Sequence, residues 1–280
     1  MLDLRPLTDT IGTEVCGIDL TEPIAAADFD RIVRAWLDTT LLLFRSQSMT
    51  PAQQIEFSRR FGELMVYTRS ENALKDYPEI LVLSNVKQDG KPIGAAVSSR
   101  YWHSDGHFLK CPPSATFLYG IEVPPRDGDT WFANTQAAYD ALPASTRRRI
   151  DGRKVIISRV KSLPYNYPER PPATDEQRAA WPDMAQPLVR THPITGRKAL
   201  YMGGNVPWNV EGMPEAESDI LIPELQAFAI QPQFLYVHRW RAGDALLWDN
   251  RSSIHRATAY DQVNHRRRMH RTSIAGDEAY

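Results

Sequence analysis

Hydrophobic residues recur at helical spacing in several segments of the chain. Residues 26–40 place their apolar side chains on one face of a helix, made up of Phe29, Ile32, Val33, Trp36 and Leu37. A second helix is predicted to start after Thr50, whose side chain can form a capping box with Gln53, and to end at Gly62. Two further segments are also predicted to be helical, at 135–150 and 214–230.

Short apolar or alternating runs, which are typical of strands, account for much of the remaining chain. They cover residues 11–20, 41–47, 79–85, 114–123, 128–134, 154–160, 187–192, 198–203, 234–240, 244–250 and 267–276. Strands that follow one another with few helical crossovers favour an antiparallel sandwich or barrel over a doubly wound parallel sheet. We therefore expect a mainly β fold with flanking helices.

Two long segments are polar, contain prolines and show little periodicity. They span residues 66–100, apart from the run at 79–85, and residues 161–186. Loops of this length in a compact domain are usually lids or binding loops. No internal repeat divides the sequence, so we expect one domain over residues 1–280, with lid or active-site loops at 66–100 and 161–186.

Composition and charge exclude several classes of protein. The chain has 280 residues, of which 42% are hydrophobic and 24% charged, and a net charge of −1, which gives nucleic-acid binding little support. Its two cysteines, Cys16 and Cys111, form neither a CxxC pair nor a disulfide framework, which suits a reducing compartment. The sequence predicts neither a signal peptide nor an apolar run of about 20 residues. We therefore expect a cytoplasmic protein with no nucleic-acid or membrane partner.

Candidate metal ligands cluster in YWHSDGHF, residues 101–108. If this stretch is a strand, His103, Asp105 and His107 point to the same face, where imidazole and carboxylate groups can share a cation. Gly106 is expected to end the strand and to turn His107 away, although spacing alone does not decide between the two histidines. An HxD motif by itself is more often a hydrogen-bonded pair than a metal site.

A third ligand must come from elsewhere in the sequence, and His255 is the best candidate. It follows a predicted strand end and turn, and it stands among small residues in WDNRSSIHRAT. Together, His103, Asp105 and His255 would form a facial triad that leaves metal positions open for a chelating cosubstrate and O2, which suits Fe(II). We expect His238 to pack within a strand and His192 to lie in a hairpin turn.

A cluster of arginines follows His255 at residues 266–271. On a strand, Arg267 and Arg271 share one face, and we expect both to point into the cavity of the triad. Guanidinium groups bind carboxylates through two parallel hydrogen bonds, so this pair predicts sites for anions. Arg266 and Arg268 lie on the opposite face, which we expect to be solvated.

These motifs together resemble the taurine dioxygenase and 2,4-dichlorophenoxyacetate dioxygenase family of Fe(II)/2-oxoglutarate enzymes. The resemblance covers nearly the whole chain and runs through FSRRFGEL, WHSDGHF, PPRDGDTWFANTQAAYDALP, LVRTHPITGRKALYM, WRAGDALLWDNRSSIHRAT and RRRMHRTSIAG. It implies a double-stranded β-helix core, that is, a cupin-like jelly roll, with Fe(II) as the metal and 2-oxoglutarate and O2 as cosubstrates. It also implies a homo-oligomer, either a dimer or a tetramer.

The resemblance implies a role for individual residues. His103, Asp105 and His255 match the iron ligands, and His107 has no ligand role in the pattern. Thr130 and Arg267 match the residues that hold the distal carboxylate of 2-oxoglutarate. Arg271 matches the arginine that binds the anionic group of the prime substrate, and Trp248 matches an aromatic residue beside the metal.

The substrate is expected to be a small organic anion. Aromatic residues suggest a pocket for an apolar or aromatic body, formed by Tyr67, Tyr101, Phe108 and Trp208. The segment after FGEL lacks the histidine that taurine dioxygenases use on the sulfonate, which argues against taurine. The implied reaction is hydroxylation with release of succinate and CO2, with bond cleavage or desaturation as other outcomes. A cupin-like enzyme that is not an oxygenase and a non-catalytic binding protein on this fold are the alternatives.

Overall fold

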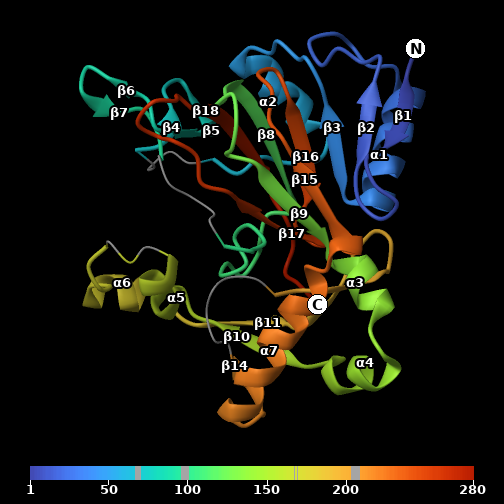
Figure 1. Cartoon of the computed structure of the whole chain (residues 1–280), viewed down its shortest axis with the longest axis vertical. Helices are drawn as coiled ribbons and strands as arrows, with labels where there is room; N and C mark the ends of the chain where they lie inside the picture. Colours follow the sequence, from blue (N-terminus) through green and yellow to red (C-terminus); the bar gives the residue numbers. More distant parts are fainter. Residues whose placement is uncertain (67–70, 96–100, 167, 169, 203–208) are drawn as a thin grey trace.

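Two β-sheets that pack against each other form the centre of the molecule (Figure 1). The computed structural model describes residues 1–66, 71–95, 101–166, 168, 170–202 and 209–280. Over these residues the larger sheet has eight strands, in the order β1 (Asp3–Pro6), β2 (Thr13–Cys16), β3 (Leu41–Phe44), β16 (Ala245–Asp249), β8 (Ala115–Glu122), β18 (Arg268–Ile274), β5 (Tyr77–Ser84) and β4 (Ala73–Leu74). The smaller sheet contains β15 (Leu235–His238), β9 (Thr130–Asn134) and β17 (Ser253–Ala257).

The packing of strand β3 explains the unbroken apolar run at residues 41–44. Leu41 and Leu43 belong to the core cluster between the sheets, together with Phe132 of the smaller sheet. Leu42 and Phe44 point to the other face of the larger sheet and join a second cluster. Because both faces of the strand are buried, all four of its residues are hydrophobic.

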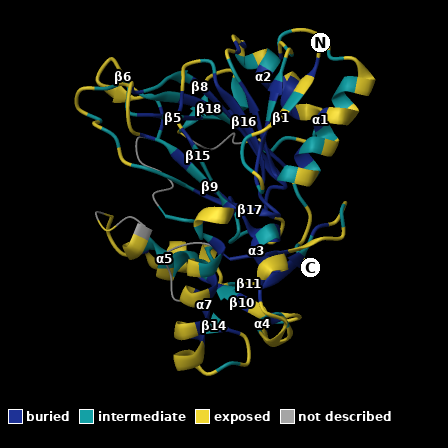
Figure 2. Ribbon diagram, turned by 45° about the vertical axis from the view of Figure 1, so that its right-hand side comes forward, coloured by how far each residue is buried: buried dark blue, intermediate teal, exposed yellow. Residues whose placement is uncertain are grey.

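Helices cover the outer face of the larger sheet. They are α1 (Ala26–Thr39) and α2 (Pro51–Arg59). Ile32 and Trp36 of α1 and Phe57 of α2 pack into the second cluster, while the outer face of α1 is exposed to solvent (Figure 2). The predicted capping box is present, because the Thr50 side chain accepts a bond from the Gln53 backbone and the Gln53 side chain accepts one from the Thr50 backbone.

A second group of elements gathers below the smaller sheet in Figure 1. It contains α3 (Thr135–Ala141), α4 (Ala144–Ile150), α5 (Arg159–Asn166), α6 (Asp175–Ala180) and α7 (Glu215–Ala229), with strands β10 (Lys154–Ile157), β11 (Met184–Pro187) and β14 (Asn209–Val210). The remaining elements are the hairpins β6 (Lys87–Gln88) with β7 (Lys91–Pro92) and β12 (Val189–Thr191) with β13 (Lys198–Leu200), and the 3-10 helix η1 (Pro232–Phe234). Apolar residues of α3, β10 and α7 share one core cluster, so these elements pack as a unit.

The structure confirms the mainly β architecture with flanking helices and corrects several element predictions. The single helix predicted over 135–150 is two helices, because Pro143 has no backbone N–H and disfavours helical geometry at Leu142. Strand β10 ends at Ile157, and residues 161–186 contain most of α5, all of α6 and part of β11, whereas we expected a loop. The strands that were not predicted are β1, β4, β6, β7, β14 and β17. None of the described helices is both long and apolar enough to cross a membrane.

Candidate metal centre and adjoining pockets

Two histidines and one carboxylate converge between the smaller sheet and the loop that precedes β8. One ligand atom from each of His103, Asp105 and His255 lies within 4.8 Å of the other two. All three side chains are buried. The structure therefore brings together the three residues that the sequence indicated as a facial triad.

Residues 101–108 do not form the strand that the alternation argument assumed. Of these eight residues, all of which are described, His103 alone forms a bridge, through backbone hydrogen bonds of 3.0 and 2.8 Å with His255. The chain turns from Asp105 onward, and Gly106 has a φ of +60°, which glycine adopts without strain. The turn brings Asp105 to the triad and sends His107 elsewhere, with its Nδ1 atom 2.7 Å from the carbonyl oxygen of Ser104.

Both imidazoles of the triad present Nε2 to the carboxylate. These atoms of His103 and His255 lie 3.8 and 4.0 Å from Oδ1 of Asp105. Nδ1 of His103 lies 2.8 Å from the carbonyl oxygen of Tyr101, which can only accept, so Nδ1 carries the hydrogen and Nε2 keeps its lone pair. Burial lowers the pKa of both rings, that of His255 to about 3. Both are therefore neutral at pH 7, the state in which imidazole binds metals.

Asp105 stays ionised although it is buried. Burial raises its pKa, but the charge of Arg271, the two imidazoles and the Thr116 hydroxyl outweigh this effect and hold the pKa below its usual range. Nη1 of Arg271 lies 3.3 Å from Oδ1 of Asp105. The guanidinium is held there by Nε and Nη2, which donate to Oγ of Ser273 over 3.3 and 3.2 Å.

A narrow cavity beside the triad has walls from both sheets. Its lining includes Thr130, Trp248, His255, Arg267 and Arg271. The ring of Trp248 lies 4.7 Å from that of His255, measured between centroids. Thr130 is buried, and its Oγ1 accepts a hydrogen bond of 2.9 Å from Nε1 of Trp240. Because the indole occupies an acceptor site of this oxygen, the hydroxyl hydrogen of Thr130 remains available for an acceptor in the cavity.

Arg267, which is half-buried and whose Nε atom is shielded from solvent, places a positive charge in the same cavity. Burial lowers the pKa of its guanidinium, and no carboxylate of the described residues forms an ion pair with it. The backbone is fixed, since the Arg267 N–H donates to Oδ1 of Asn85 over 2.8 Å. A buried cation without a counter-ion is costly, so a cavity that contains Arg267 and the Thr130 hydroxyl suits an anionic ligand such as a carboxylate.

A larger pocket opens on the other side of the metal site, with a volume of about 330 Å³, in the range of small-molecule sites. Arg271 lines this pocket as well as the narrow cavity. The predicted residues Tyr101 and Phe108 also line it. The guanidinium carbon of Arg159 lies 4.8 Å from the Phe108 ring centroid and 3.8 Å from that of Trp181. The pocket thus combines aromatic walls with cationic groups.

Other predicted residues have different positions. Tyr67 and Trp208 lie outside the described residues. Arg266 is solvated, with a side chain 67% exposed that pairs with Glu122. The prediction of a solvated face was wrong for Arg268, which is half-buried, because α2 packs against that face of β18.

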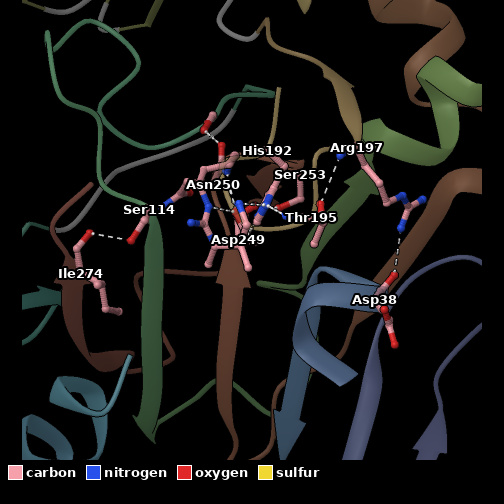
Figure 3. Close-up of polar contacts among 12 residues, drawn as sticks. Asp38, Ser114, His192, Thr195, Arg197, Asp249, Asn250, Ser253 and Ile274 are labelled. Carbon is pink, nitrogen blue, oxygen red and sulfur yellow. Dashed lines mark hydrogen bonds and ion pairs between the residues drawn. The ribbon is translucent and has the colours of Figure 1, made fainter. Parts of the chain in front are cut away.

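A buried polar network supports the end of β16 (Figure 3). Oδ2 of Asp249 lies 3.1 Å from Nε2 of His192, and both carboxylate oxygens accept bonds from the Arg251 side chain. Nδ1 of His192 accepts backbone N–H groups of residues 194 and 195 in the β12–β13 turn, so its Nε2–H donates to Asp249. His192 thus lies in the predicted hairpin turn and ties that turn to β16.

Several residues of the site were missed by the sequence interpretation. They are Thr116, Trp240, Asn250, Ser273, Arg159 and Trp181. Thr116 and Ser273 stand within strands that read as core, so pattern alone offers no signal for them. For Asn250 the sequence did contain a signal, because a polar Asp-Asn pair directly follows the apolar strand ALLW.

Comparisons with known proteins agree with this geometry. Residues 3–273 match the family model described as taurine catabolism dioxygenase TauD, TfdA family. The chain is 35% identical to the alpha-ketoglutarate-dependent 2,4-dichlorophenoxyacetate dioxygenase of Cupriavidus pinatubonensis, over 98% of this chain and 97% of the relative. It is 33% identical to the (S)-phenoxypropionate/alpha-ketoglutarate-dioxygenase of Sphingobium herbicidovorans, over 99% and 96%. The crystal structure of AAD-2 in complex with Mn(II) and N-oxalylglycine superposes with a TM-score of 0.85 at 30% identity, covering 100% of this chain and 99% of that one.

Proposed function

The chain belongs to the taurine catabolism dioxygenase TauD, TfdA family, and from this premise we propose that it oxidises a small organic anion with an aromatic body. It is an Fe(II)- and 2-oxoglutarate-dependent dioxygenase with a jelly-roll core, so the predicted family, fold and reaction class are confirmed. The family assignment also removes the support for a non-oxygenase enzyme or a binding protein. The aromatic body of the substrate is the new element of the proposal.

The residues of the triad fit Fe(II). Two neutral imidazoles and one ionised carboxylate form the donor set that non-heme iron prefers when coordination positions must stay open. His103 is fixed by its bond to Tyr101, and His255 is packed between Phe132 and Trp248. We propose His103, Asp105 and His255 as the iron ligands.

The narrow cavity is the proposed site for the distal carboxylate of 2-oxoglutarate. The observation that carries this step is the Arg267 guanidinium, whose Nε atom is buried and which lines one cavity with His255 and has no counter-ion among the described residues. Thr130 offers a hydroxyl hydrogen to the same carboxylate, since Trp240 already donates to its oxygen. Charge and hydrogen bonding therefore both favour a carboxylate at this end.

The larger pocket is the proposed substrate site. Arg271 would bind the anionic group, and the rings of Tyr101, Phe108 and Trp181 would contact the body of the substrate. A carboxylate on an aryl or aryloxy group matches both features. The two curated relatives described above are named for phenoxyacetate and phenoxypropionate substrates, which have this combination.

The position of the bound substrate relative to the metal site determines which of its carbons is oxidised. Fe(II), 2-oxoglutarate and O2 together supply an oxidant that attacks an unactivated C–H bond, with succinate and CO2 as co-products. Because Arg271 lies 3.3 Å from the metal ligand Asp105, an anion bound to it places the adjacent carbon nearest the metal. We therefore expect hydroxylation next to the anionic group. If that carbon also bears an ether oxygen, the product is a hemiacetal and its C–O bond breaks.

Residues 161–186 are proposed as an active-site segment because Ser162, Leu163, Arg170 and Trp181 line the substrate pocket. Residues 66–100 contribute Leu81 to the same pocket and are proposed in the same role. A single domain over 1–280, a cytoplasmic location, assembly as a dimer or tetramer, and the roles of Tyr67 and Trp208 stay predictions.

The test is a substrate panel with succinate release as the readout. The protein is supplied with Fe(II), 2-oxoglutarate and O2, together with phenoxyacetate, its neutral amide phenoxyacetamide, taurine or a linear alkyl sulfate. We expect phenoxyacetate to stimulate succinate release and the amide, which cannot pair with Arg271, to leave it at the rate without substrate. Stimulation by the alkyl sulfate but not by phenoxyacetate would refute the aromatic body.

A further inference from the structure

The two oxygens of the Asp105 carboxylate have different surroundings. Oδ1 lies 3.8 and 4.0 Å from Nε2 of the two triad histidines and 3.3 Å from Nη1 of Arg271. Oδ2 lies 2.7 Å from Oγ1 of Thr116, a residue of β8 that is fully buried. The carboxylate thus has one oxygen toward the metal position and one toward the interior of the larger sheet.

The hydrogen of the Thr116 hydroxyl must lie on the bond to Asp105. Oγ1 of Thr116 is also 2.9 Å from Nδ2 of Asn250, and an amide nitrogen can only donate. Thr116 therefore accepts from Asn250 and directs its single hydrogen to Oδ2. Oδ2 thus accepts a hydrogen bond from a donor whose direction is fixed.

The orientation of the Asn250 amide follows from its other contacts. Its Oδ1 atom accepts Nε1–H of Trp248 over 2.9 Å and the backbone N–H of Asp105 over 3.4 Å. Both groups are donors only, so a flipped amide would set its NH2 group against two N–H groups. Donor chemistry alone thus fixes a chain of hydrogen bonds that runs from Trp248 through Asn250 and Thr116 to Asp105.

Asn250 itself is held firmly at the end of β16. Its backbone N–H donates to the Ser114 carbonyl over 2.9 Å, and its carbonyl accepts from Oγ of Ser104 over 2.6 Å. Figure 3 shows Asn250 beside Ser114 and next to Asp249, which is bonded to His192. The chain of hydrogen bonds is therefore anchored where β16 ends in the larger sheet.

We propose that Thr116, oriented by Asn250, is a positioning residue that makes Asp105 a metal ligand through Oδ1 alone. This inference rests on the proposed metal site at the triad. A carboxylate that binds through both oxygens would occupy one of the three positions left open by a facial triad. Two of those positions are needed by a chelating keto acid and one by O2. By holding Oδ2, Thr116 keeps all three available.

The test compares two variants at Thr116 with a matched control. Thr116→Val keeps the shape of the side chain and removes the hydroxyl, whereas Thr116→Ser restores it. Thr272→Val is the control, because Thr272 is also a fully buried threonine of the larger sheet, with its Oγ1 atom 2.7 Å from Oγ of Ser58 and no contact with the triad. Thermal unfolding confirms that each variant is folded before metal is added.

Binding of Mn(II), followed by electron paramagnetic resonance, is the first readout. We expect Thr116→Val to weaken Mn(II) binding about 10- to 100-fold, the usual effect of removing a group that orients a metal ligand. Thr116→Ser should recover most of this loss, and Thr272→Val should bind Mn(II) like the wild type. A second readout is the visible absorption of the anaerobic Fe(II) protein with 2-oxoglutarate, which should weaken in Thr116→Val and return in Thr116→Ser.

Two results would overturn the inference. One is an unchanged Mn(II) affinity in Thr116→Val, and the other is an equal loss in Thr272→Val, which would indicate a general loosening of the sheet. Failure of the proposed metal site itself is distinguishable, because the wild type would then not bind Mn(II) with an affinity that depends on His255.

Discussion

Nη1 of Arg271 lies 3.3 Å from Oδ1 of Asp105, so the cation that lines the proposed substrate pocket directly contacts the carboxylate of the proposed metal site. Both atoms belong to buried or largely buried side chains, and Ser273 holds the guanidinium in place. A substrate anion paired with Arg271 would therefore be adjacent to the metal. This contact links substrate binding to the metal site without any intervening residue.

Arg271→Gln should impair binding of the substrate much more than binding of the metal. Loss of a buried charge partner typically costs about 2–5 kcal/mol, which corresponds to at least a 30-fold increase in the KM for an anionic substrate. Mn(II) affinity should be retained or increased, because a positive charge beside Asp105 opposes a cation. Steady-state kinetics and a Mn(II) titration measure the two effects, with the solvated Arg266→Gln as the control. Equal KM values in the two variants would show that another group binds the anion.

His255→Ala should abolish both metal binding and turnover, since it removes one of the three proposed ligands. His107→Ala is the matched control, because His107 is a half-buried histidine near the site whose Nδ1 is bonded to the Ser104 carbonyl. We expect His107→Ala to bind stoichiometric Fe(II), measured by metal analysis after desalting. Loss of iron in His107→Ala with retention in His255→Ala would reverse the proposed set of ligands.

Arg267→Ala should raise the concentration of 2-oxoglutarate needed for half-maximal activity by about 30-fold or more, since the distal carboxylate would lose its buried counter-ion. The KM for the prime substrate should change little. Arg268→Ala, on the opposite face of the same chain segment, is the control. If Arg267→Ala left the 2-oxoglutarate requirement unchanged, the cosubstrate would have to bind outside the narrow cavity.

Arg159→Gln should weaken binding of aromatic substrates selectively. The guanidinium stacks between Phe108 and Trp181 and stabilises this wall of the pocket. Cation–π contacts contribute about 0.5–2 kcal/mol, so we expect the KM for an aryl carboxylate to rise about 2- to 30-fold. The concentration of 2-oxoglutarate needed for half-maximal activity should not change. A parallel increase for an aliphatic carboxylate would mean that Arg159 does not act through the aromatic wall.

His270→Gln should make the protein less sensitive to acid. Burial, and then the charge of Arg268, lower the pKa of His270 to about 4 in the folded state, against about 6.5 in an unfolded chain. Between these values the unfolded chain binds a proton that the folded one does not, so the stability from the neutral ring is complete above pH 6.5. It is lost as the pH falls to 4, by about 3 kcal/mol in total.

The measurement is the free energy of unfolding by urea at pH 7 and pH 4.5 for the wild type and for His270→Gln. The variant should lose less stability between the two pH values. The same loss in both proteins would show that His270 is protonated without penalty in the folded state.

Much of the chemistry was determined by the sequence alone. The apolar periodicity of residues 26–40 and the capping box at Thr50 depend on contacts within a few residues, so their pattern predicted α1 and α2 correctly. The identities and order of His103, Asp105, His255 and the arginines carried the resemblance to the family. Residue types and local spacing are sufficient for such features because each motif occupies one short segment.

The tertiary structure decided how those groups are aimed. His103 and Asp105 meet through a turn at Gly106, although strand alternation had suggested a different geometry. The hydrogen bond that holds Oδ2 of Asp105 depends on Thr116 and on Asn250, which lies 134 positions further along the chain. Hydrogen-bond direction requires both partners to be in place, and β8 and β16 are neighbours only in the folded sheet. The sequence therefore determined which groups the site contains, while the fold determined how the atoms of each group are oriented and hydrogen-bonded.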